Sequence, residues 1–89
     1  MSLDTPISDL PNLGPRSQAV LAAAGITTVA QLRRLGSVAA YAKAKRSGAN
    51  VSLNLLWALE GALTGLPWQV VAREHRTSLL LALELHGDA

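Results

Sequence analysis

Leu10-Pro11-Asn12-Leu13-Gly14-Pro15-Arg16-Ser17 is the stretch that decides how this chain begins to fold. Proline is favoured at the first position of a helix, where its missing N–H costs nothing, and glycine is accepted just before it. The pattern therefore predicts a turn that ends at Gly14 and a helix that starts at Pro15. Gly25 supplies the C-terminal stop of this helix, which is predicted over residues 15–24.

Further start and stop signals divide the next part of the chain. Thr28 and Gln31 have the spacing of a capping box, so a second helix is predicted from residue 29 to the Gly36-Ser37 pair. Ser37 is expected to cap a third helix, over residues 38–47, and Ser52 to cap a fourth.

The fourth helix is predicted over residues 53–64, with Gly61 in its interior. Glycine there costs about 1 kcal/mol relative to alanine, and the close approach of a neighbouring helix would explain it. Residues 67–86 fit two hypotheses, which are a turn over 67–72 followed by a helix over 74–86, or one helix from Pro67.

Composition and periodicity favour helices throughout. The chain has 89 residues, 49% of them hydrophobic, with no Phe, one Tyr and two Trp, so the core must be almost entirely aliphatic. No stretch alternates with a period of two, as a strand would. We predict one all-α domain over residues 7–89, a bundle of four to five short helices that is helix-hairpin-helix or SAM-like, preceded by a disordered or vector-derived tail over residues 1–6.

Several classes of function are disfavoured by what the sequence lacks. Without cysteine there is no disulfide, thiolate metal site or cysteine nucleophile. No catalytic triad, carboxylate pair, Walker loop or dinucleotide-binding motif occurs, so we expect neither an enzyme nor a bound metal or cofactor. Apolar runs such as residues 79–83 are too short to span a bilayer, so no membrane partner is expected. The absence of disulfides and of a signal peptide predicts a cytoplasmic protein.

The charges are strongly segregated along the chain. Residues 10–59 contain no Asp or Glu, whereas the ends of the chain are acidic. The basic residues of this segment are Arg16, Arg33, Arg34, Lys43, Lys45 and Arg46. A basic body points to a polyanion or an acidic protein as partner, and a solvated basic surface remains the alternative.

The turn and the two helices around it resemble a helix-hairpin-helix element, with Asn12 where such elements carry a first glycine. Asparagine tolerates positive φ, so the turn can form. Main-chain N–H groups at such a turn bind phosphate. The candidate nucleic-acid contacts are Asn12, Leu13, Gly14, Arg16, Ser17, Arg33 and Arg34. An ordinary helix-start turn with Leu13 packed inward is the alternative.

A longer resemblance covers residues 8–75. This part of the chain closely resembles the C-terminal domain of the TfoX/Sxy competence regulators. The segments that carry the resemblance are Leu10–Ser17, Ala23–Ile26, Gln31–Arg33, Val51–Ala62 and Trp68. In that bacterial family the domain follows an N-terminal α/β domain and takes part in switching on DNA-uptake genes with the cyclic-AMP receptor protein. A fainter similarity is to the C-terminal domain of the RNA polymerase α subunit.

Three functions stay open at this point. The first is a regulatory interaction module that docks on a transcription protein, with the cyclic-AMP receptor protein and RNA polymerase as candidates. Its candidate contacts are Trp57, Lys43 and Arg46, although Trp57 also fits a place in the core. The second is binding to the backbone of double-stranded DNA, and the third is a structural or dimerisation domain that pairs through residues 79–85.

Overall fold

Helices account for most of residues 7–86, which are the residues that the computed structural model describes. The elements are η1 (Ile7–Asp9), α1 (Pro15–Ala23), α2 (Val29–Arg46), α3 (Leu53–Thr64), α4 (Trp68–Glu74) and α5 (Arg76–Leu85). No strand occurs within the described range, so the predicted all-α class is confirmed. The predicted tail over residues 1–6 lies outside the described residues.

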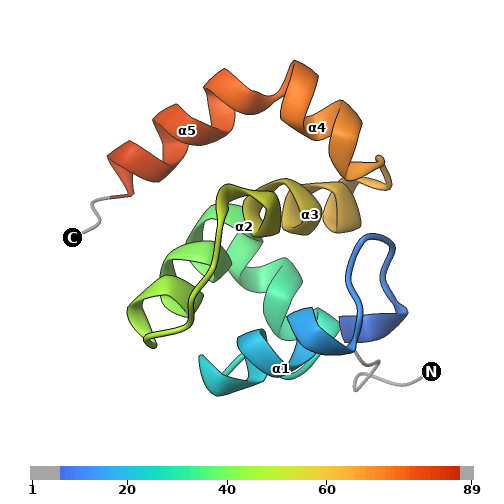
Figure 1. Ribbon diagram of the computed structural model, residues 1–89, viewed down its shortest axis with the longest axis vertical. Helices are drawn as coiled ribbons and strands as arrows, with labels where there is room; N and C mark the ends of the chain where they lie inside the picture. The colour runs from blue at the N-terminus through green and yellow to red at the C-terminus, as the bar shows by residue number, and fades with distance from the viewer. Residues whose placement is uncertain (1–6, 87–89) are drawn as a thin grey trace.

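Helices α2 and α3 form the centre of the fold, with α1 on one side and α4 and α5 on the other (Figure 1). The core between them is aliphatic, as the composition predicts. Its fully buried large side chains are Ile7, Leu21, Ile26, Leu32, Leu56, Leu59 and Val71. Removal of this apolar surface from water is the main force that holds the short helices together.

The turn before α1 has the predicted backbone. Asn12 adopts a φ of 69°, in the left-handed region that asparagine tolerates better than other non-glycine residues. Gly14 precedes the helix in an extended conformation and Pro15 is its first residue. Gly25, at a φ of 87°, follows the last turn and allows the chain to reverse.

Helix α2 contains both of the helices predicted between residues 29 and 47. It begins at a capping box in which the Gln31 N–H donates to Thr28 Oγ1 at 3.2 Å and the Thr28 N–H donates to Gln31 Oε1 at 3.2 Å. Gly36, with φ 84° and ψ 167°, interrupts the helix where a boundary was predicted. Ser37 has a different task from the predicted cap, because its buried hydroxyl donates to Glu60 Oε1 at 2.7 Å.

Helix α3 has the predicted bounds, but the reason for Gly61 is different from the predicted one. A Cβ at this position would collide with the side-chain nitrogen of Asn12 and with the carbonyl oxygen of Leu66. The close neighbours are therefore the turn before α1 and the loop after α3, and not a helix. Gly65, with a φ of 80°, ends α3 in the left-handed conformation and leads the chain into that loop.

The C-terminal part of the chain corrects both sequence hypotheses. Residues 68–74 form a helix and not a turn, so α4 begins directly after Pro67. The chain then breaks at His75, with φ −115° and ψ 6°, before α5 begins at Arg76. Leu79 on α5 is buried in the core cluster, and α5 packs against α2 and α4.

Candidate functional site

The turn before α1 is tied to the far end of α3. The Asn12 side-chain nitrogen donates to the Leu66 carbonyl oxygen at 2.9 Å, directly over Gly61. Leu13 is only 5% exposed, so its side chain packs inward as the structural alternative predicted. The side chains of Asn12 and Leu13 therefore hold the turn in place.

An open groove runs between α1 and α3 and has a volume of about 430 Å³. One wall is formed by the turn and the first part of α1, and the other by the start of α3 and the loop before it. Trp68, the first residue of α4, closes one part of the groove and is 37% exposed. We call this feature the α1–α3 groove, and the residues that line it are Asn12, Arg16, Ser17, Val20, Asn50, Val51, Ser52, Asn54, Leu55, Ala58 and Trp68.

The electrostatic character of the α1–α3 groove is positive. Arg16 is the one charged side chain among the described residues that line it, and it is exposed. Both flanking helices present N-terminal first turns there, and neither Gly14 nor Ser52 caps its helix with a side-chain hydrogen bond. The partial positive charge of these helix ends adds to that of Arg16. The groove therefore favours negatively charged groups.

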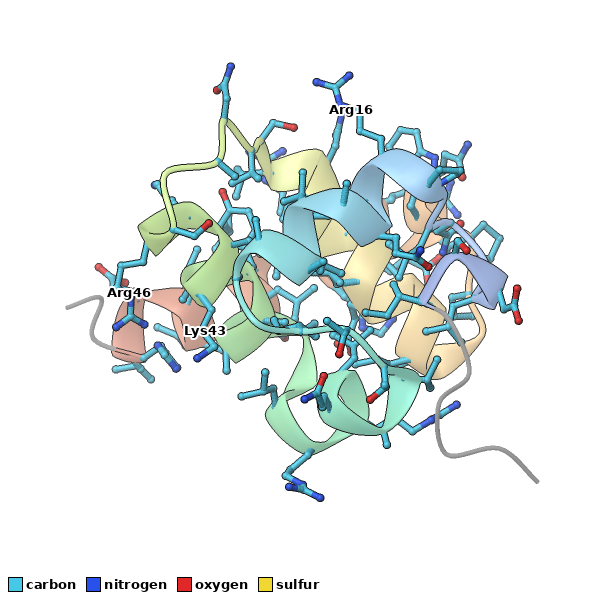
Figure 2. The ribbon with its side chains drawn as sticks, turned by 90° about the horizontal axis from the view of Figure 1, so that it is seen from below. Arg16, Lys43 and Arg46 are labelled. Carbon is cyan, nitrogen blue, oxygen red and sulfur yellow. The ribbon has the colours of Figure 1, made fainter. Side chains whose placement is uncertain are left out.

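The remaining predicted cations lie elsewhere on the surface. Arg33 and Arg34 are exposed on the first half of α2. Lys43 and Arg46 lie on its second half, where they border a shallower hollow of about 340 Å³ beside Ala23 and Ala24. Figure 2 shows Lys43 and Arg46 near each other and Arg16 well away from them.

This distribution limits what the basic residues can do together. A nucleic-acid strand that follows a protein surface needs successive cations along its path. Arg16 lies well away from Lys43 and Arg46, so the three are not immediate neighbours on such a path (Figure 2). The fold brings Lys43 and Arg46 together, but not the whole basic set.

The two tryptophans lie in different environments. Trp57 is 5% exposed and belongs to the core cluster, so its indole is not on the surface and its assignment as a partner contact is wrong. Trp68 is the exposed tryptophan.

The polar residues around the start of α3 were also missed. Asn50, Ser52 and Asn54 are exposed and line the α1–α3 groove. Serine and asparagine are favoured at helix starts and turns, where their side chains can hydrogen-bond to nearby backbone, and this cluster of such residues was the available signal.

No group of three or more His, Asp or Glu side chains within residues 7–86 is placed to hold a metal ion. Burial raises the pKa of the Tyr41 phenol above its ordinary value, and Tyr41 lies in the core, away from the groove. No helix of the described chain is both long enough and apolar enough to cross a membrane.

Comparison with known proteins points to one family. The family model of the TfoX C-terminal domain matches residues 4–83. The DNA transformation protein TfoX of Haemophilus influenzae is 35% identical over 77 residues, which are 86% of this chain and 36% of that protein. The chain thus spans about a third of the length of this curated relative. No solved structure matches the chain significantly.

Proposed function

The chain belongs to the TfoX C-terminal domain family, and on that basis we propose that it is a non-enzymatic regulatory interaction module that docks on a transcription protein. The relative's printed name, DNA transformation protein, supports a role in competence regulation. In this proposal the module acts in the bacterial cytoplasm, and its partner is RNA polymerase or the cyclic-AMP receptor protein.

The observation that carries the proposal is the α1–α3 groove. Tryptophan and arginine are enriched among the residues that carry most of the binding energy in protein interfaces. Trp68 and Arg16 both line this groove, together with the half-buried apolar side chains of Val20 and Leu55. Such a mixture of apolar surface and a single charge suits a protein partner.

A direct binding measurement tests the proposal. Purified RNA polymerase and purified cyclic-AMP receptor protein are each titrated against the immobilised 89-residue chain by biolayer interferometry. We expect at least one of them to bind, and Trp68→Ala to weaken that binding by at least about tenfold. Lys45→Gln, an exposed cation outside the groove, is the control and is expected to bind like the wild type.

Two results would contradict the proposal. One is that neither transcription protein binds above a reference surface at micromolar concentrations. The other is that Trp68→Ala binds as tightly as the wild type, which would remove the α1–α3 groove from the docking surface.

Binding to the DNA backbone is the second candidate function, and the turn before α1 favours it. Asn12 has the positive φ that this type of turn requires, and the first turn of α1 carries Arg16 and Ser17 with no side-chain cap on its N–H groups. In a fluorescence anisotropy titration with a labelled duplex, affinity should fall steeply between about 50 and about 200 mM salt. An unchanged affinity in Arg16→Glu would assign the turn a purely structural role.

Pairing with a second copy is the third candidate, and it depends on α5. Leu81 is 54% exposed and Leu85 is 77% exposed, so an apolar strip on α5 remains in contact with water. Sedimentation velocity tests this candidate, because a dimer that uses the strip should dissociate in Leu85→Glu.

A further inference from the structure

We propose that the α1–α3 groove binds an acidic peptide segment, with one carboxylate at Arg16 and a neighbouring apolar side chain against Trp68. This inference rests on the proposed docking function and names the chemistry of the partner. It assigns the groove to a protein segment and not to a nucleic acid.

The charge of the groove supplies the first argument. No acidic side chain is among its described lining residues, and Arg16 is exposed at its edge. A carboxylate placed there gains a charge-assisted hydrogen bond from the guanidinium. The first turns of α1 and α3 strengthen the attraction, because no side chain caps their N–H groups.

The apolar lining supplies the second argument. Val20 and Leu55 are half-buried in the walls, and Trp68 leaves more than a third of its surface exposed beside them. An apolar side chain that enters the groove would remove part of this surface from water. A purely polar anion would leave it exposed.

The polar lining supplies the third argument. Asn50 and Asn54 are exposed at the groove, and each amide side chain carries both hydrogen-bond donors and an acceptor. A peptide main chain offers the complementary N–H and C=O groups at every residue. A nucleic-acid backbone offers successive phosphates, and the groove has one cation with which to meet them.

Peptide selection tests the inference on the 89-residue chain. Random peptides of about 12 residues are selected by phage display, resynthesised with a fluorophore and titrated by anisotropy at about 50 mM salt. We expect the selected peptides to share an Asp or Glu next to a large apolar residue. Replacing that Asp or Glu with its amide should weaken binding about tenfold.

Matched variants of the domain locate the peptide. Arg16→Gln is expected to weaken binding about tenfold and Trp68→Ala about thirtyfold, because Arg16 meets the carboxylate and Trp68 the apolar side chain. Lys45→Gln should stay within about twofold of the wild type, since a single exposed charge outside the groove contributes little. Thermal melts of each variant by circular dichroism confirm that the fold is retained.

Three outcomes would overturn the inference. Selected peptides could be neutral or basic, both groove variants could bind them as well as the wild type, or a single-stranded oligothymidylate could displace them at an equal or lower concentration. These outcomes are separate from failure of the proposed function. If acidic peptides bind in the groove but neither transcription protein binds, then the inference about the groove is supported and the proposed function is contradicted.

Discussion

Replacing Gly61 with alanine is expected to destabilise the domain, although the same change in an ordinary helix is stabilising. A Cβ at residue 61 would collide with the Asn12 side-chain nitrogen and with the Leu66 carbonyl oxygen. The Leu66 atom in question is a backbone carbonyl oxygen, so it can move away from the new Cβ only if the loop after α3 moves with it. Asn12 can retreat only by giving up its 2.9 Å hydrogen bond to that same carbonyl.

The magnitude follows from opposing contributions to the free energy of unfolding. Overpacking of a tight contact costs about 1–3 kcal/mol, and loss of one hydrogen bond costs about 1 kcal/mol. The greater helix propensity of alanine relative to glycine raises the free energy of unfolding by about 1 kcal/mol. The net loss is therefore about 2 kcal/mol, which corresponds to a fall in Tm of about 8–16 °C for a domain of this size.

Urea unfolding followed by circular dichroism measures this loss, and Asn12→Gly provides the matched background. Glycine accepts the positive φ of residue 12 and removes the side chain that the new Cβ would strike. We therefore expect Gly61→Ala to cost about 1 kcal/mol less in Asn12→Gly than in the wild type. A Gly61→Ala variant as stable as the wild type, or more stable, would refute the close approach at this position.

Three smaller predictions address other contacts of the fold. Ser37→Ala should lower the free energy of unfolding by about 1–2 kcal/mol in urea titrations, because the Glu60 carboxylate loses its 2.7 Å donor. Thr28→Ala should cost about 1 kcal/mol in the same assay by removing the cap of α2. Because burial raises the pKa of Tyr41, an unfolded chain releases this proton first, and stability should fall as the pH rises above about 10. Tyr41→Phe should show a smaller fall between about pH 9 and pH 11 than the wild type.

The parts of the fold that the sequence predicted well are those determined by residues close together in the chain. Proline, glycine and the capping box act within one helical turn, so the start of α1, the start of α2 and the break at Gly36 could be located without knowing the tertiary structure. The same applies to the bounds of α3, which lie between Ser52 and Gly65.

The parts that could not be predicted depend on contacts between distant segments. The neighbours of Gly61 come from residue 12 and from the loop after α3, and no local pattern records that meeting. After the bend at His75, α5 packs against α2, and Trp68 at the start of α4 lines the groove. These are contacts between segments far apart in the sequence, which is why the groove was missed while several of its residues were found.

Two polar contacts orient helices that aliphatic packing alone would leave free to slide. Burial of leucine and isoleucine is non-directional, whereas hydrogen bonds fix the positions of their partners. The Ser37 hydroxyl donates to Glu60 on α3, and the Asn12 amide donates to the Leu66 carbonyl in the loop after α3, where it lies over Gly61. Asn12 also lines the α1–α3 groove, so the second contact positions part of the groove wall. Loss of the Asn12 contact should therefore weaken binding in the groove even at temperatures where the variant remains fully folded.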